Sequence, residues 1–261
     1  MQLELQDKVV LITGGSKGIG LACARAFLNE GARVAIAARN QDSLNLAVKT
    51  FSSEGYKVHA ERINLNNISE VKSGVNRIED SLGQINVLVN SAGSSKHHDP
   101  MSYDSERWIQ GIEDKFIPTM QIIDTVIPRM AHNGGGAVIN IIGVGGKVAM
   151  PSHMAGGAAN AALILVTASL AKVWGPSGVR INAINPGPNE TDRLKASLKV
   201  KAQTSNISVE QQRFKSVSNI PLGRFGCPDD VASLALFLAS ARASYITGAI
   251  IPVDGGAYAT P

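Results

Sequence analysis

The chain has 261 residues, of which 44% are hydrophobic, so it can bury a substantial core and is too hydrophobic to be disordered. Its formal net charge of +4 is spread along the chain without a run of Lys or Arg, which argues against nucleic-acid binding. The two cysteines, Cys23 and Cys227, have neither metal-ligand nor disulfide spacing, so we expect no metal site and a reducing compartment.

The start of the chain carries no secretory signal, and no apolar run approaches membrane-spanning length. We therefore expect a cytoplasmic protein with a small-molecule substrate and without a membrane partner.

Short apolar runs alternate with longer amphipathic segments along the whole chain. Strands are expected over residues 8–12, 34–38, 57–63, 87–89, 137–142, 179–184 and 249–253. Helices are expected over residues 18–30, 42–53, 68–82, 104–130 (with a kink at Pro118), 153–174 and 229–239. Such alternation, with right-handed crossovers, predicts an α/β fold: a single Rossmann-type domain over 1–261, with a doubly wound parallel sheet of about seven strands and helices on both faces.

The segment 192–218 differs from the rest of the chain. It is polar and has no strong period, so we expect a flexible flap there.

The glycine-rich stretch after the first strand predicts a dinucleotide site. Gly14, Gly18 and Gly20 follow a G-x-x-x-G-x-G pattern between a strand and a helix, where they permit a tight turn and the approach of a pyrophosphate. The second strand ends at Arg39 where an acidic residue would favour NAD, and Lys17 adds a second cation. This pair favours NADP(H) over NAD(H); the alternative is that Arg39 is a solvated charge at a helix start.

Four motifs in this order resemble those of the short-chain dehydrogenase/reductase family, of the classical type, over about residues 5–257. They are residues 13–20, residues 90–93, residues 185–187 with Thr191, and residues 253–256. The resemblance implies a set of cofactor contacts along the carboxyl edge of the sheet. These are Gly14, Ser16, Lys17, Gly18, Ile19, Gly20, Arg39, Asn64, Leu65, Asn90, Ala92, Gly93, Pro186, Gly187 and Thr191.

Two of those contacts depart from or extend the family pattern. Asn64 stands where an aspartate usually contacts adenine, and its amide can still hydrogen-bond a base edge. Asn90 is expected both to line the cofactor and to stabilise the central strand.

The resemblance also implies four catalytic residues that this chain lacks. The family's serine, tyrosine, lysine and asparagine fall on Gly143, Gly156, Asn160 and Lys115. No tyrosine occurs between residues 104 and 244, so a small shift of the alignment does not restore one. Ordinary general acid–base catalysis at position 156 is lost, and the two glycines would enlarge the substrate pocket.

Replacement groups are available nearby. Lys115, His153 and Asn160 are the candidate catalytic residues: Lys115 restores a positive charge, and His153 titrates near neutrality. The alternatives are a surface helix cation for Lys115 and a helix-start residue for His153. Polar residues of the adjoining loops can also border the pocket. They are Ser152, Lys147, His97 and His98.

We therefore expect an NADP(H)-binding oxidoreductase by fold, with atypical chemistry, redox or non-redox, on a bulky carbonyl, hydroxyl or aromatic substrate. The alternatives are a non-catalytic cofactor-binding pseudoenzyme or oligomer partner, and a slow conventional carbonyl reductase. The resemblance further implies a homotetramer or a dimer.

Overall fold

The computed structural model describes residues 2–93 and 98–258. Seven parallel strands form one sheet in the order β3-β2-β1-β4-β5-β6-β7. Their bounds are β1 Val9–Thr13, β2 Arg33–Ala38, β3 His59–Arg62, β4 Ile85–Asn90, β5 Gly136–Ile141, β6 Val179–Pro186 and β7 Ile250–Val253. The predicted doubly wound sheet is confirmed. The strand order reverses between β1 and β4, and in such sheets ligands bind at this point, outside the carboxyl ends of the strands.

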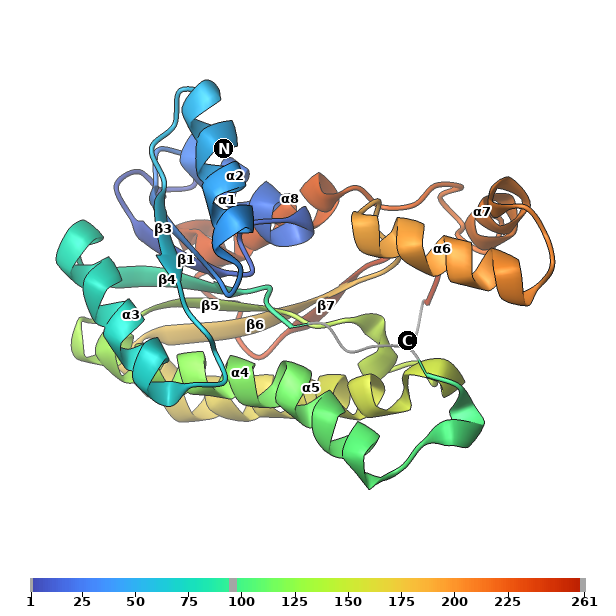
Figure 1. Cartoon of the computed structure of the whole chain (residues 1–261). Coiled ribbons are helices and arrows are strands. Elements are labelled where there is room, and N and C mark those ends of the chain that lie inside the picture. Colours follow the sequence, from blue (N-terminus) through green and yellow to red (C-terminus); the bar gives the residue numbers. More distant parts are fainter. Residues whose placement is uncertain (1, 94–97, 259–261) are drawn as a thin grey trace.

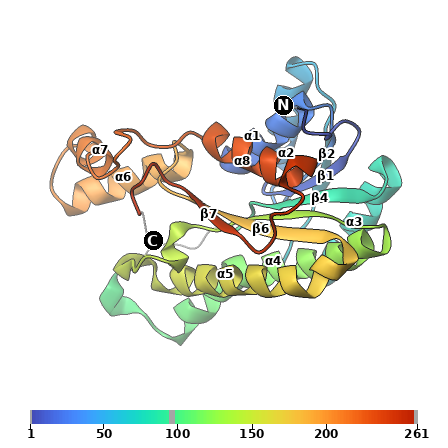
Figure 2. The same cartoon turned by 180° about the vertical axis from the view of Figure 1, so that it is seen from behind.

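Helices cover both faces of the sheet. The helices α1 (Gly18–Asn29), α2 (Gln41–Ser53) and α8 (Pro228–Ala239) lie on one face. The helices α3 (Ile68–Leu82), α4 (Ser105–His132) and α5 (Met154–Trp174) lie on the other (Figures 1 and 2). All six lie within a few residues of the predicted segments, because a long amphipathic period is the most reliable signal in a sequence.

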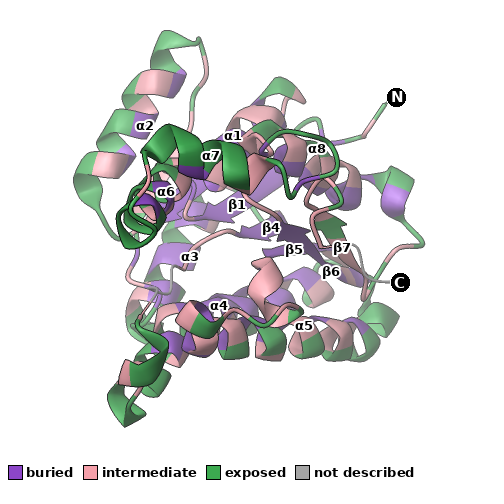
Figure 3. Ribbon diagram, turned by 90° about the vertical axis from the view of Figure 1, so that its right-hand side faces the viewer, coloured by how far each residue is buried: buried purple, intermediate pink, exposed green. Residues whose placement is uncertain are grey.

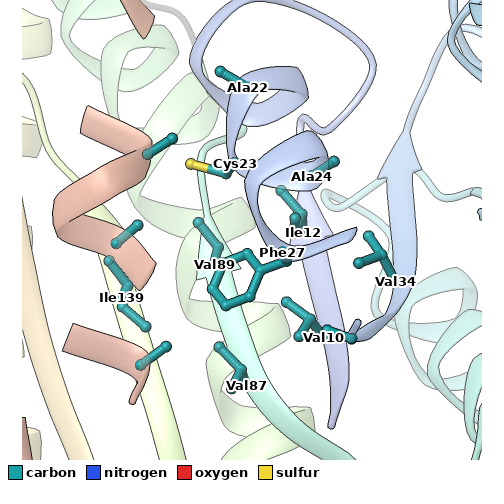
Figure 4. Close-up of a cluster of buried hydrophobic side chains, with 14 of the residues drawn as sticks. Val10, Ile12, Ala22, Cys23, Ala24, Phe27, Val34, Val87, Val89 and Ile139 are labelled. Atoms are coloured by element: carbon teal, nitrogen blue, oxygen red, sulfur yellow. The ribbon is translucent and has the colours of Figure 1, made fainter. Parts of the chain in front are cut away.

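The two faces have separate cores. Phe27 of α1 lies fully buried among Val10, Val87 and Val89 of the sheet (Figure 4). Next to it, burial raises the pKa of the Cys23 thiol to about 12, so this cysteine is an inert core residue. Fully burying a side chain such as Phe27 contributes about 1.5–3 kcal/mol, and this packing fixes the positions of the strand ends that form the site.

The segment 192–218 is more ordered in structure than its sequence suggests. It forms two helices, α6 (Asp192–Thr204) and α7 (Val209–Val217), which project beside the carboxyl ends of the strands (Figure 1). Most of their residues are exposed (Figure 3). Within them only Leu198, Ala202 and Gln212 are buried, so the apolar period was too sparse to reveal a helix.

Helix α5 corrects the expectation about apolar runs. The stretch Pro151–Ser177 is long and apolar enough to cross a membrane, and an 18-residue window within it has a mean hydropathy of 1.6. Its residues Ala159, Leu163 and Ala171 are buried against the sheet and α4, and 44% of the window is buried in all, whereas Leu165 and Val173 are exposed. Among the described residues, no group of three or more metal-ligating side chains is suitable for a metal ion.

Candidate active site

The glycine loop after β1 forms a cradle in which the backbone or its surroundings require glycine at several positions. Gly14 and Gly18 have φ angles of +68° and +54°, which glycine adopts without strain. A Cβ atom on Gly20 would lie 2.3 Å from the Gly14 carbonyl oxygen. Helix α1 begins here at Gly18, and neither a capping side chain nor an acidic residue occupies its first turn. Its free amides and dipole therefore suit a pyrophosphate.

The opposite wall of this crevice comes from the end of β6. The Gly187 amide donates to Val253 O of β7 at 2.9 Å, and the Asn189 side chain donates to Gly187 O at 2.9 Å. These bonds fix the loop that carries Thr191. A Cβ atom on Gly18 would lie 3.4 Å from Thr191 Cγ2, so Thr191 faces the glycine loop directly. The structure thus brings together two segments, the glycine loop and the loop after β6, that are both predicted to contact the cofactor.

A line of buried polar side chains runs beneath the crevice. Thr13 donates to Asn90 at 3.5 Å, and Asn90 donates to Asn140 of β5 at 2.9 Å. Asn140 donates in turn to Thr167 of α5 at 3.0 Å, and Thr167 donates to Leu163 O at 2.7 Å. Asn90 therefore stabilises the central strands, one of its two predicted roles.

The adenosine side is more open. Arg39 and Lys17 are both exposed, where they can reach a phosphate without a cost of burial. Asn64 Oδ1 accepts the Asn66 amide at 3.2 Å, so this side chain already shapes its own loop. Leu65 is buried beside it, and Ala92 lies within 3 Å of the Cβ position of Gly14.

Three of the four positions assigned to the missing catalytic residues lie together, after β5 and in the first two turns of α5. Gly156 and Asn160 are buried one turn apart in α5. Asn160 Nδ2 lies 3.2 Å from where a Cβ atom on Gly143 would stand. The Oδ1 atom of Asn160 is buried and lacks a hydrogen-bond partner among the described residues. A buried acceptor of this kind is costly to leave unpaired, and a ligand hydroxyl would satisfy it.

Lys115 is buried and is not the surface cation of the alternative interpretation. Its side chain is 8% exposed, and its Cα and Cγ atoms lie 3.4 Å from the Cβ position of Gly93. Burial, with a smaller contribution from the positive charge of Arg193, lowers the pKa of Lys115 to about 8. This pKa lies within reach of neutral pH, which suits a proton donor or acceptor.

A proline shapes the backbone beside Lys115. Helix α4 continues through Pro118, which has no N–H to donate to the carbonyl of Asp114 four residues earlier. This carbonyl oxygen lies 3.1 Å from the Cβ position of Gly93. It is therefore left as an acceptor near the Lys115 side chain.

His153 precedes α5 at its N-cap position and is buried, so the structure places it both at a helix start and near the site. The His98 amide donates to Ser152 O at 2.8 Å, which joins the loop after Gly93 to the loop before α5. Lys147 is exposed and donates to Ile250 O at 3.4 Å, away from Lys115. His97 lies outside the described residues.

Sequence reasoning missed three residues of this region. Asn140 and Thr167 are polar residues in runs that otherwise signal core, and a buried polar residue inside a strand could have drawn attention. Arg193 belongs to α6, the helix that the sequence did not predict.

The geometry agrees with comparisons to known proteins. A family model described as enoyl-(acyl carrier protein) reductase matches residues 14–258. The chain belongs to the short-chain dehydrogenase/reductase family. The 3-oxoacyl-[acyl-carrier-protein] reductase FabG of Chlamydia pneumoniae is 33% identical to this protein. The match covers 98% of this chain and 99% of the relative.

Solved structures agree with this assignment. L-sorbose reductase from Gluconobacter frateurii, in complex with NADPH and L-sorbose, matches the whole chain with a TM-score of 0.93 and 28% identity, over all of its own length. A 7α-hydroxysteroid dehydrogenase in complex with NADH matches 98% of the chain with a TM-score of 0.88 and 29% identity, over 96% of its own length. The fold is therefore that of NAD(P)-dependent reductases, and neighbours of both cofactor types exist.

Proposed function

We propose that this protein is an NADP(H)-dependent oxidoreductase in which Lys115 handles the proton that the family's tyrosine handles elsewhere. The single observation that carries this proposal is the burial of Lys115, whose Cα and Cγ atoms pack against Gly93. A buried lysine is costly unless it serves a purpose, because desolvation disfavours its charge. Its pKa of about 8 lets it both donate and accept a proton near neutral pH.

The chain's own residues fit a bound nicotinamide dinucleotide. Gly14, Gly18 and Gly20 leave room for the pyrophosphate, and Arg39 with Lys17 favours the additional phosphate of NADP(H). Asn160 Oδ1 is available to accept a ribose hydroxyl. When bound, the nicotinamide supplies or accepts a hydride. Lys115 then donates a proton to the substrate oxygen in reduction, or accepts one in oxidation.

Gly143 and Gly156 define the substrate side. Neither has a side chain, so a bulky or aromatic carbonyl or alcohol can approach the place where serine and tyrosine would stand. His153 is a secondary candidate for proton transfer because it is buried at the start of α5. We further propose a cytoplasmic homo-oligomer, with the helices α6 and α7 acting as a flexible cover of a single domain.

The second candidate is a cofactor-binding protein without catalysis. One observation favours it: Gly156, at the tyrosine's position, has no group that can carry a proton. Both proposals require NADP(H) binding, and they differ in the fate of the hydride.

The test is to purify the protein, measure NADPH and NADH binding by fluorescence titration, and follow NADPH oxidation with a panel of aromatic ketones and 2-oxo acids. We expect tighter binding of NADPH and slow turnover that Lys115→Met reduces by more than about tenfold. Lys195→Gln, which removes an exposed charge elsewhere, is the matched control. NADPH binding without turnover of any carbonyl compound would favour the non-catalytic protein, and turnover unchanged in Lys115→Met would remove Lys115 from the mechanism.

A further inference from the structure

We propose that Arg213 of α7 is a positioning residue, which holds the cover formed by α6 and α7 in the place where Thr191 lies against the glycine loop. Its guanidinium group pairs with Glu190, before the cover, and lies over the ring of Phe225, after it. One side chain therefore joins the two ends of the cover. The inference rests on the proposed function in one respect, because the cofactor whose release this contact controls is the NADP(H) proposed for that site.

The cover leaves and rejoins the rest of the protein through two short segments that lie side by side. They are residues 188–190, before α6, and residues 225–226, after α7, and they form a parallel bridge. The Glu190 amide donates to Gly226 O at 2.8 Å, and the Gly226 amide donates to Pro188 O at 3.0 Å. We call these two segments the neck, because the chain both enters and leaves the cover through it.

The apolar contact beneath the cover is small. Most residues of α6 and α7 are exposed, and the two helices project away from the sheet (Figure 1). The buried cluster beneath them consists of Leu198, Ile220 and Phe225, with Leu194 and Val217 partly buried against it. Segments with few buried apolar contacts open locally at low free-energy cost. A polar contact can therefore decide how long this cover stays in place.

Arg213 contacts both segments of the neck. Its guanidinium group donates to the Glu190 carboxylate, and its Cζ atom lies 5.0 Å from the centre of the Phe225 ring. The Phe225 side chain is buried and therefore fixed, whereas the side chains of Arg213 and Glu190 are about half exposed. An exposed ion pair and an exposed cation–π contact each stabilise only weakly, but here the same side chain makes both. Movement of the cover on its neck breaks the two contacts together.

The neck leads directly into the cofactor site. Thr191 follows Glu190 at the N-cap of α6, and its Cγ2 atom lies 3.4 Å from the Cβ position of Gly18. The Thr191 hydroxyl donates to Asn189 O at 3.3 Å, so the neck determines where this side chain lies. A dinucleotide whose pyrophosphate lies on the glycine loop must pass Thr191 when it leaves. Arg213 thus acts on cofactor release through Glu190 and Thr191.

The first experiment measures amide hydrogen exchange by mass spectrometry in the full chain without cofactor. Arg213→Met removes both contacts, so exchange in α6 and α7 should become about fivefold faster or more, while the helices on the sheet stay unchanged. Arg213→Lys keeps a cation for Glu190 and should stay within about twofold of the wild type. The matched control is Arg25→Met. Arg25 makes the same two kinds of contact elsewhere, an ion pair with Glu54 at 2.8 Å and a cation–π contact with Phe51 at 5.6 Å, so its loss should leave exchange in the cover unaltered.

The second experiment measures the rate of NADPH dissociation by stopped-flow fluorescence, with excess NADP⁺ as the displacing ligand. Arg213→Met and Glu190→Gln should each raise this rate by about threefold or more. The direction in Glu190→Gln is decisive, because removing a negative charge would by itself slow the release of an anionic cofactor. Lys215→Met removes an exposed cation from the same helix and should leave the rate within about twofold of the wild type.

Unaltered exchange in the cover of Arg213→Met would overturn the proposal. So would faster exchange over the whole chain, which would mean that the variant is only less stable. Faster exchange in the cover with unchanged NADPH dissociation, or slower dissociation in Glu190→Gln, would also overturn it, because the neck would then have no influence on the cofactor. If the wild-type protein binds no NADPH, the proposed function fails, and the exchange measurement still decides whether Arg213 holds the cover.

Discussion

The glycines of the loop after β1 differ in backbone conformation from Gly143 and Gly156 on the catalytic side of the crevice. In the cradle after β1, Gly14 and Gly18 have positive φ angles, and a Cβ atom on Gly20 would collide with a backbone carbonyl. At the catalytic side, Gly143 has an ordinary extended backbone and Gly156 lies within helix α5. The backbone requires glycine in the cradle and does not require it at positions 143 and 156. The glycines of the cradle are therefore needed for the backbone conformation, whereas Gly143 and Gly156 leave space that a ligand can occupy.

The largest effect is expected from closing the cradle. In Gly20→Ala the new Cβ atom would lie 2.3 Å from Gly14 O, which cannot move without displacing the loop. We expect NADPH affinity to fall at least ~100-fold, or by about 3 kcal/mol. The matched control is Gly175→Ala, where nothing lies within 4 Å of the added atom and affinity should be unchanged. A Gly20→Ala protein that binds NADPH normally would contradict a steric requirement at this turn.

The second effect concerns the cost of the buried ammonium group. Burial lowers the pKa of Lys115 from 10.5 to about 8 in the folded protein. Below pH 8 the group is charged in both the folded and unfolded states, so the folded state bears the full penalty. Between pH 8 and 10.5 only the unfolded chain keeps the proton, and the penalty disappears as pH rises.

Relative to Lys115→Met, the wild-type free energy of unfolding should therefore increase on the order of 3 kcal/mol between pH 7 and pH 10.5. Denaturant titrations of both proteins across this range measure the difference, since other titrating groups are common to the two. A difference that stays constant with pH would mean that Lys115 is solvated in the folded protein.

A smaller effect is expected at the cofactor's outer end. Arg39→Ala removes a cation near the expected 2′-phosphate, and because Arg39 is exposed we expect a loss of about tenfold in NADPH affinity. NADH affinity should stay within about twofold, since NADH carries no such phosphate. Fluorescence titration with both cofactors gives the ratio. If the affinities for NADPH and NADH fell by the same factor, Arg39 would have only a general electrostatic effect and no contact with the 2′-phosphate.

The smallest effect separates stability from binding at Asn160. Asn160→Leu replaces a buried amide whose Oδ1 has no partner among the described residues with an apolar group of similar size. We expect the free energy of unfolding to rise by about 1 kcal/mol and NADPH affinity to fall several-fold. Asn182→Leu is the matched control, because its amide donates to Ile246 O and accepts from Ala249, so its loss should destabilise the protein. Unchanged NADPH affinity in Asn160→Leu would remove this residue from the cofactor site.

The sequence predicts the sheet and the six helices that pack on it better than it predicts helices α6 and α7. Short apolar runs identified the strands, long amphipathic segments identified the six helices that pack on the sheet, and the glycine pattern located the cradle. Helices α6 and α7 were not predicted, because few of their residues are buried. The burial of Lys115 could not be predicted from the sequence either, since it depends on the approach of α4 to Gly93. The chemistry assigned to positions 115, 143, 156 and 160 stays a prediction.

The chain of side-chain bonds from Thr13 through Asn90 and Asn140 to Thr167 has a consequence for how such a protein can change. It ties three neighbouring strands to helix α5 from below, without help from any residue that would face a substrate. The floor of the crevice is thereby held rigid independently of its contents. Residues above that floor can be exchanged while a bound dinucleotide keeps its place, so new reactions become accessible to an old scaffold by a handful of substitutions.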